Sequence, residues 1–298
     1  NTACFGAYHM TELRPGEQAV FVANPNYFRG KPYYDRVVYR AVPSAGSRLT
    51  LLKSRQVQWI ERPSTQQVTD LQKDANVKVQ DTFGRSLSSI RMHVGIKPFD
   101  DVRVRQALNH AVNRAAIAQS MYFGLAEEAK SIVPPALGGY DPSFFRYPYD
   151  PAKAKAMLAE AGYPNGFEVE LLYGSEYWWE EPQCILVANQ LKEVGVTAKP
   201  TKITLADLRA RGAINRMDVS NRARYANPAL DALVDQGRQT LDREKRYELM
   251  RQAQKVWMDD APWLLTVYPT IFEAMAPNIV GWTPHPDDHE RWVDLKVV

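Results

Sequence analysis

The sequence predicts a mixed α/β protein, and three observations support that prediction. Short runs rich in β-branched and aromatic residues, such as residues 37–42, are typical of strands. Other segments repeat apolar residues every three or four positions behind a capping residue, which is typical of helices. The two kinds alternate along 298 residues, 45% hydrophobic and 24% charged, without repeats, low-complexity stretches or a linker. A chain of this length can form two domains or one large one.

The first sixty or so residues predict three strands and a helix. Residues 20–22 form an apolar strand that runs into an Asn-Pro turn, because proline fixes φ and asparagine hydrogen-bonds locally. A second strand over 37–42 ends at Pro43. A helical pattern of leucines within 49–52 then leads to a third strand over 57–60.

The next segment predicts a further helix and two more strands. Ser64 can cap a helix over residues 65–73. Val77 and Val79 alternate with lysines, which is typical of an exposed strand. Residues 86–94 alternate less regularly and predict another strand.

The most regular pattern lies in residues 98–124 and predicts a single helix. Asp100 or Asp101 caps it and places negative charge at the positive end of the helix dipole. Small and apolar residues at helical spacing form one stripe by which this helix packs: Val104, Leu108, Ala111, Val112 and Ala115. Four polar residues are expected largely off that stripe: Arg103, Arg105, Asn109 and Arg114.

The middle of the chain predicts a loop followed by another α/β unit. Residues 131–149 mix proline, glycine and aromatic residues without a period, which indicates an ordered loop. Asp150 and Pro151 then begin a helix that ends at Gly162. Further patterns predict a strand over 167–173, a helix over 182–194 and a strand over 196–199.

The C-terminal part predicts two helices and a buried strand. Asn227 with Pro228 begins one helix, and Asp242 caps a longer one. The apolar run 263–268 indicates a single buried strand. The tail from Gly281 is a proline-containing extension with two tryptophans.

Three stretches of the sequence resemble the solute-binding proteins of bacterial peptide/nickel-type ABC importers, known as extracellular family 5. They are NPNYFRGKPYYDRVVYRAVPSAGSRLTLLKSRQVQWIE, PFDDVRVRQALNHAVNR and YDPAKAKAMLAEAGYPNGFEVELL. The resemblance implies a two-lobe periplasmic-binding-protein fold (type II, cluster C-like) with mixed sheets and flanking helices. It places residues 1–82 and 270–298 in an incomplete first lobe and 83–269 in the second lobe.

The sequence also departs from the family pattern. Only Gly6 and Tyr8 match the turn near the start, so part of the first lobe is expected to be missing. A cleft segment is expected to be missing near 218–220, and Arg55 and Gln58 stand where members usually place glycine and aspartate. Residues 1–10 lack a secretion signal and an initiator methionine, so a cut or processed start is expected.

Composition and motifs argue against several classes of protein. A net charge of +3 with scattered basic residues disfavours a nucleic-acid partner. No apolar run approaches the roughly 20 residues that cross a bilayer. Gly174-Ser175-Glu176 follows a predicted strand but lacks the glycine spacing of a nucleophile elbow, and no other catalytic constellation is found, so no enzyme is expected. No cofactor motif is present either.

A metal site and a disulfide are weaker candidates. His285, Asp287, Asp288, His289 and Glu290 are suitable ligands in type, but the neighbouring prolines prevent a helix that would align two histidines. A solvated loop is therefore the favoured interpretation. Cys4 and Cys184 could pair only if the fold brings them together, and the sequence leaves this open.

An aromatic cluster after the 167–173 strand is the candidate ligand site. Tyr173, Tyr177, Trp178 and Trp179 either pack on the 131–149 loop or form an apolar clamp for a ligand. Three nearby basic residues could bind a carboxylate or phosphate, or could simply be solvated: Arg85, Arg91 and His93.

The resemblance implies a function that the residue patterns alone do not. It implies an extracytoplasmic or periplasmic monomer that captures a small solute, peptide-like or otherwise amphipathic, and delivers it to the membrane permease of an ABC importer. Closure of two lobes around the ligand would be a hinge motion. The alternative is a structural or interaction fragment that binds no solute.

Overall fold

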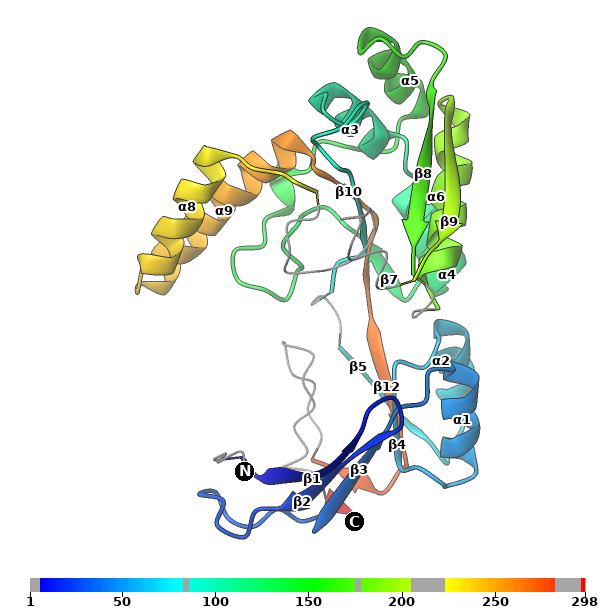
Figure 1. The fold of residues 1–298 in the computed structure, drawn as a ribbon, viewed down its shortest axis with the longest axis vertical. Coiled ribbons are helices and arrows are strands. Elements are labelled where there is room, and N and C mark those ends of the chain that lie inside the picture. The colour runs from blue at the N-terminus through cyan, green and yellow to red at the C-terminus, as the bar shows by residue number, and fades with distance from the viewer. Residues whose placement is uncertain (1–5, 83–85, 175–177, 205–222, 282–295, 298) are drawn as a thin grey trace. The chain divides into compact units, whose positions relative to one another are not determined.

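The computed structural model describes residues 6–82, 86–174, 178–204, 223–281 and 296–297. The chain divides into two compact units, which are taken separately here (Figure 1). Unit 1 comprises Asn1–Thr82 with Ile271–Val298, and unit 2 comprises Phe83–Thr270. Among the described residues, no helix combines the length and the apolar character needed to span a bilayer.

Unit 1 contains a three-stranded antiparallel sheet. Its strands are β1 (Tyr8–Arg14), β2 (Gln18–Ala23) and β3 (Arg36–Arg40), in that order. The Asn-Pro turn expected after β2 is confirmed, since the Asn24 side chain accepts from the Asn26 amide at 3.0 Å.

A second antiparallel sheet in unit 1 joins distant parts of the chain. β12 (Ile271–Met275) lies between β4 (Trp59–Glu61) and β5 (Lys78–Thr82). Two helices, α1 (Ala45–Lys53) and α2 (Thr65–Leu71), supply side chains to the core of this sheet. That core consists of Leu52, Ile60, Leu71 and Ala274, with Leu49, Val57, Val77 and Val79 packed against it.

Local capping in unit 1 agrees with the sequence. Ser64 accepts from the Gln67 amide, while the Gln67 side chain accepts from the Ser64 amide, so the expected cap is a full capping box. Near the end of the chain, β13 (Ile279–Val280) pairs with β14 (Lys296–Val297).

In unit 2 the single helix expected over 98–124 is wrong, because the structure contains two helices. α3 (Val102–His110) is capped by Asp101, and α4 (Arg114–Tyr122) is capped by Asn113. The Asn113 side chain accepts from the Ala116 amide at 2.9 Å, and its own amide donates to Gln190 at 3.0 Å. These bonds satisfy a helix N-terminus at this position, so the apolar spacing alone does not keep one helix continuous.

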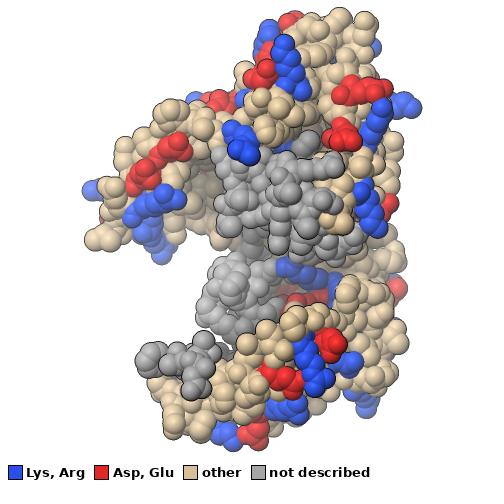
Figure 2. Space-filling model, viewed as in Figure 1, with Lys and Arg blue, Asp and Glu red and all other residues tan. Residues whose placement is uncertain are grey.

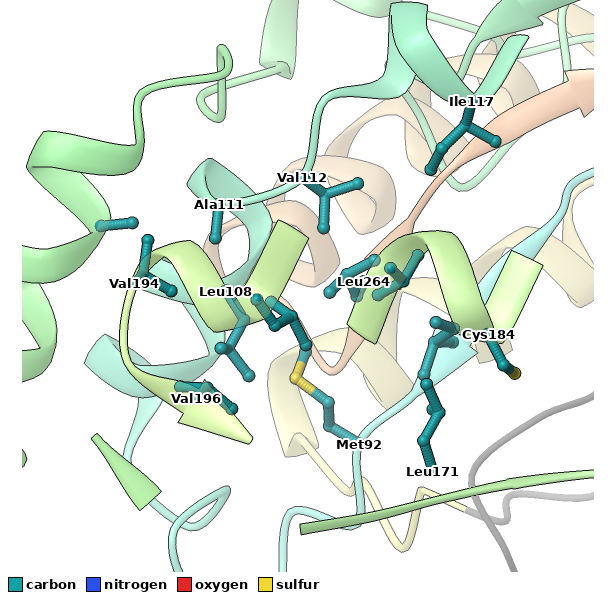
Figure 3. Close-up of a cluster of buried hydrophobic side chains, with 14 of the residues drawn as sticks. Met92, Leu108, Ala111, Val112, Ile117, Leu171, Cys184, Val194, Val196 and Leu264 are labelled. Atoms are coloured by element: carbon teal, nitrogen blue, oxygen red, sulfur yellow. The ribbon is translucent and has the colours of Figure 1, made fainter. Parts of the chain in front are cut away.

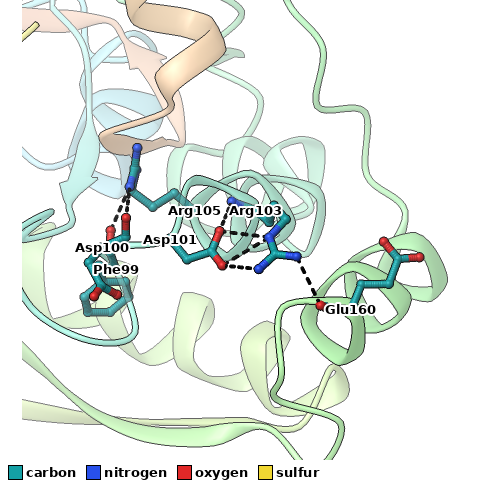
Figure 4. A network of polar contacts seen from close by, with 6 residues as sticks. All are labelled: Phe99, Asp100, Asp101, Arg103, Arg105 and Glu160. Atoms are coloured by element: carbon teal, nitrogen blue, oxygen red, sulfur yellow. Dashed lines mark hydrogen bonds and ion pairs between the residues drawn. The ribbon is translucent and has the colours of Figure 1, made fainter.

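The expected exposure of the polar residues of this segment is also wrong for three of them. Arg105, Asn109 and Arg114 are 6%, 0% and 2% exposed. Arg105 donates to the Phe99 carbonyl at 2.8 Å and to the Asp260 carbonyl at 2.8 and 2.9 Å (Figure 4). Backbone carbonyls thus compensate for burial of the guanidinium. Arg103 stays exposed and pairs with Asp101.

A parallel strand pair forms one side of unit 2. β8 (Phe167–Tyr173) and β9 (Val196–Lys202) are connected by α6 (Glu180–Glu193). At the start of both strands the backbones approach closely: a Cβ on Gly166, whose φ is +71°, would lie 1.8 Å from the Gly195 carbonyl oxygen. The first core of unit 2 lies against this pair, and Figure 3 shows Leu108, Val112, Ile117, Leu171, Cys184, Val196 and Leu264 within it.

The apolar run 263–268, expected to be one strand, forms two. β10 (Trp263–Leu265) pairs with β6 (Ser89–Arg91), and β11 (Val267–Pro269) pairs with β7 (Ala126–Glu128). The change of partner occurs at Thr266, whose hydroxyl donates to the Ser88 carbonyl at 2.8 Å.

The remaining elements of unit 2 surround a second core. They are η1 (Pro142–Phe144), α5 (Pro151–Glu160), α8 (Pro228–Gln239) and α9 (Arg243–Asp260). The second core combines Trp257, Met258 and Tyr268 with aromatic residues of the 131–149 segment. That segment is irregular apart from η1, as its composition predicts.

Candidate functional site

The aromatic cluster lies where β8 ends and α6 begins. Tyr173 is 6% exposed, and Trp178 and Trp179 are half-buried. The two indole rings meet edge to face with centroids 5.7 Å apart, and Trp178 is tilted against Tyr122 of α4 at 6.0 Å. All four residues belong to or pack on the first core, whereas the aromatic residues of the 131–149 segment pack in the second.

The first turn of α6 fixes the backbone beside the tryptophans. The buried Glu180 carboxylate accepts from the Gly174 amide at 2.7 Å, and Glu181 follows it on the exposed side. Two carboxylates here are favoured by the partial positive charge of a helix N-terminus. Burial raises the pKa of Tyr173, and a hydrogen bond with the Glu181 carboxylate raises it further.

A buried polar cluster attaches α6 to the central strands. The Ser88 hydroxyl donates to the Gln183 side chain at 2.6 Å, and the Thr266 hydroxyl lies 3.4 Å from the same oxygen. Burial raises the pKa of the Tyr122 hydroxyl, which also contacts Ser88. The platform that carries Trp178 and Trp179 is therefore held by hydrogen bonds as well as by apolar packing.

Arg91 does not join the aromatic cluster. It is 1% exposed, and its guanidinium lies 4.7 Å from the ring centroid of Trp263, its register partner on β10. Its neighbours Ile90 and Met92 belong to the first core with Trp178, and side chains alternate along a strand. Arg91 and Trp178 therefore lie on opposite faces of β6.

Trp263 is the residue in this region that the sequence did not single out. Its ring contacts Trp257 edge to face at 5.2 Å as well as the Arg91 guanidinium. The only signal in the sequence is a tryptophan at the start of an apolar run. Its pairing with Arg91 depends on a register between residues far apart in the chain, which no local pattern reveals.

The other predicted residues divide into two groups. His93 is half-buried, and its Nδ1 accepts from the Gly95 amide at 3.2 Å. Arg85, Tyr177, Cys4 and the histidine- and aspartate-rich segment at 285–290 lie outside the described residues. Cys184 is buried in the first core. Within the described ranges, no group of three or more His, Cys, Asp or Glu residues could hold a metal ion.

Comparison with known proteins identifies relatives among bacterial binding proteins. The sequence profile described as "Bacterial extracellular solute-binding proteins, family 5 Middle" matches residues 1–238. Heme-binding protein A of Haemophilus influenzae is 28% identical over 98% of this chain and 59% of its own length. The dipeptide-binding protein of Escherichia coli is 27% identical over 94% of this chain and 58% of its own. The chain thus spans about three fifths of the length of these curated relatives.

Solved structures with the same fold include two peptide complexes. The periplasmic binding protein DppA from Helicobacter pylori, in complex with the peptide STSA, has a TM-score of 0.86 and 24% identity over 98% of this chain and 62% of that one. The oligopeptide-binding protein AppA from Bacillus subtilis, in complex with a nonapeptide, has a TM-score of 0.84 and 23% identity, covering 98% and 66%.

At these identities the structures show the shared fold, which is that of periplasmic binding proteins with mixed sheets and flanking helices. The profile match covers most of the chain and agrees with it. The chain therefore belongs to family 5 of the bacterial extracellular solute-binding proteins.

Proposed function

We propose that this chain is the substrate-binding component of a bacterial ABC importer, which captures a small solute and delivers it to a membrane permease. The observation that carries the proposal is the family match over residues 1–238. It is supported by relatives named for binding heme, dipeptides and glutathione. These names favour a peptide-like or otherwise amphipathic solute.

In this proposal unit 1 is the first lobe, incomplete relative to the family, and unit 2 is the second lobe. Binding proteins of this kind close around the ligand by a hinge, and contacts from both lobes stabilise the closed state. The chain acts as an extracytoplasmic monomer and does not catalyse a reaction. Nucleic acid is not a partner, which the mixture of charges on the face drawn in Figure 2 supports.

The proposed ligand contacts are the predicted site residues: Tyr173, Tyr177, Trp178, Trp179, Arg85, Arg91 and His93. Support is strongest for Trp178 and Trp179, because both rings keep part of their surface exposed on a rigid platform. It is weaker for Arg91, since a ligand would have to displace the Trp263 ring that covers its guanidinium.

A thermal-shift panel tests the proposal. A solute that binds only the folded chain stabilises it by about 2.7 kcal/mol at a hundredfold excess over Kd, so at least one member of the panel should raise the melting temperature. The panel contains dipeptides, glutathione, heme and sugar phosphates. The dipeptide-binding protein of Escherichia coli serves as the positive control.

Two variants connect the panel to the aromatic cluster. Trp178→Ala and Trp179→Ala should each lower the ligand-induced shift, while Phe28→Ala, which removes an 80% exposed aromatic from unit 1, should leave it unchanged. If no member of the panel shifts the melting temperature, the alternative of a non-binding structural or interaction fragment is favoured. Turnover of a peptide or ester that Ser175→Ala abolishes would instead indicate an enzyme.

A further inference from the structure

The outer edge of β8 is distinct from the other strand edges of unit 2. β8 pairs with β9 in parallel, and the Ile203 amide donates to the Tyr173 carbonyl at 3.0 Å, so Tyr173 directs its backbone groups towards β9. Backbone direction alternates along a strand. The N–H and C=O groups of Glu168, Glu170 and Leu172 therefore point away from β9.

These outward groups form no hydrogen bond with any part of the chain that the structure describes. The edge closes only at Gly174, whose amide donates to Glu180. Backbone polar groups need a partner or water, and an open strand edge is a template for an added strand. β9 carries features that discourage such pairing, namely Pro200 and two lysines, whereas β8 has neither proline nor lysine.

We propose that β8 accepts an extended peptide as an added strand, with basic side chains at every second position of the peptide. The proposal rests on the proposed function, because it specifies the class of solute and where its backbone is bound. Strand addition provides affinity through backbone hydrogen bonds and selectivity through alternate side chains.

The basic preference follows from the charges beside the open edge. Glu168 and Glu170 are both exposed and lie on the same face of β8. Lys199 of β9 pairs with Glu168 at 2.5 Å, while Glu170 has no ion pair among the described residues. A lysine or arginine opposite Glu170 on an added strand would form a favourable cross-strand pair.

The opposite face of β8 specifies the intervening positions. Val169 is half-buried and Leu171 is 4% exposed, and both pack with the first core. An added strand would place its intervening side chains beside this apolar surface. The matching sequence alternates basic and β-branched residues, such as Lys-Val-Lys-Val-Lys.

The charges also argue against a second copy of the chain as the occupant. Antiparallel pairing of two β8 edges centred on Glu170 would place this carboxylate directly opposite its counterpart. Like charges in that position are destabilising. A basic peptide is therefore favoured over self-association.

Amide exchange followed residue by residue by NMR tests the edge in the whole chain. Without peptide, the amides of Glu168, Glu170 and Leu172 should exchange faster than those of Val169, Leu171 and Tyr173, which bond to β9. Saturating Lys-Val-Lys-Val-Lys should slow the first three by about tenfold or more. The acidic peptide Glu-Val-Glu-Val-Glu should not, and the basic peptide methylated at every internal amide should bind about tenfold more weakly.

A matched pair of variants isolates the backbone donor. Glu170→Pro removes the outward N–H, and proline is tolerated on strand edges. Glu170→Ala keeps the N–H and removes only the charge. Binding of the basic peptide should be lost in the first and weakened in the second.

Each other outcome contradicts the inference in a separable way. If panel peptides raise the melting temperature but leave the three outward amides unprotected, the solute binds elsewhere and the proposed function survives. Slow exchange of those amides without peptide means that the edge is already covered. Dimerisation that Glu170→Pro prevents, seen by analytical ultracentrifugation, would identify a second copy as the occupant.

Discussion

Gly166 and Gly195 allow β8 and β9 to begin beside each other. The positive φ of Gly166 and the 1.8 Å separation between its hypothetical Cβ and the Gly195 carbonyl oxygen leave no room for a side chain. Gly162, a few residues earlier, also has a positive φ but has no atom within 4 Å of its hypothetical Cβ. The two positions therefore separate the cost of the backbone conformation from the cost of the clash.

Gly166→Ala should lower the free energy of unfolding clearly more than Gly162→Ala. The control carries only the backbone strain, about 1–2 kcal/mol, whereas the clash adds about 1–3 kcal/mol because the strands must separate. Urea unfolding followed by circular dichroism measures both. Equal losses would show that the strand starts can move apart at little cost.

Arg114 is a buried cation whose role is structural. Its guanidinium donates to the carbonyls of Asn109, Val112 and Tyr147 at 3.1–3.3 Å and to the Asn109 side chain at 3.0 Å. Burial lowers the pKa of Arg114 to about 10, so the side chain remains protonated at neutral pH. It holds the break between α3 and α4 against the Tyr147 backbone.

Arg114→Met should destabilise the chain by about 3–5 kcal/mol, because it leaves several buried acceptors without a donor. Arg103→Met, on the same segment but at an exposed ion pair, should cost less than about 1 kcal/mol. Chemical denaturation of the two variants checks the difference. Similar small losses in both would mean that water replaces the Arg114 guanidinium.

At the scale of elements, helix starts were the most predictable feature of the fold. Ser64, Asp101, Asp150, Asn227 and Asp242 all cap the helices expected from them. A cap depends on a few adjacent residues, so the sequence contains nearly all the information. The break at Asn113 was missed because the apolar stripe continues across it, although asparagine is itself a favoured cap.

Burial and pairing between distant elements were much less predictable. Arg105 and Arg114 are buried because carbonyls of α9 and of the 145–148 region accept from them, and these acceptors are remote in sequence. The candidate site shows the same limit. Its aromatic part was identifiable from composition, but the separation of Arg91 from Trp178 depends on how β6 pairs.

His110 joins α3 to the start of α5 and should make this joint sensitive to pH. It is 2% exposed, its Nδ1 donates to the Pro148 carbonyl at 2.8 Å, and its carbonyl accepts from the Asp150 amide. Burial lowers the pKa of His110 below its usual 6.5, an effect opposed by the bond to Pro148. The unfolded chain therefore binds this proton more readily than the folded chain.

The contribution of His110 to stability should be present above about pH 6.5 and decrease as the pH falls below it. Urea midpoints at pH 7.5 and 5.0 measure the loss in the parent chain. His110→Gln should show a smaller loss over the same interval, because it cannot gain the proton. An identical loss in both would assign the pH dependence to other groups.

At the scale of the whole molecule, the family resemblance predicted more than periodicity did. Alternating helices and strands indicate only a mixed α/β protein, whereas the three matching stretches implied family 5 and its binding-protein fold, which the comparisons confirm. Even so, the second sheet of unit 1 requires residues 271–275 to pair with strands some two hundred residues earlier. Such pairings follow from the family and not from local chemistry.

The central claim is that this chain holds a solute without transforming it. Equilibrium dialysis of the purified chain against the dipeptides and glutathione of the panel, with the retained solute identified by mass spectrometry, tests both parts together. The account predicts saturable retention of at least one solute, one molecule per chain, with its mass unchanged. Retention no greater than in buffer, or recovery of a cleaved or modified solute, would contradict it.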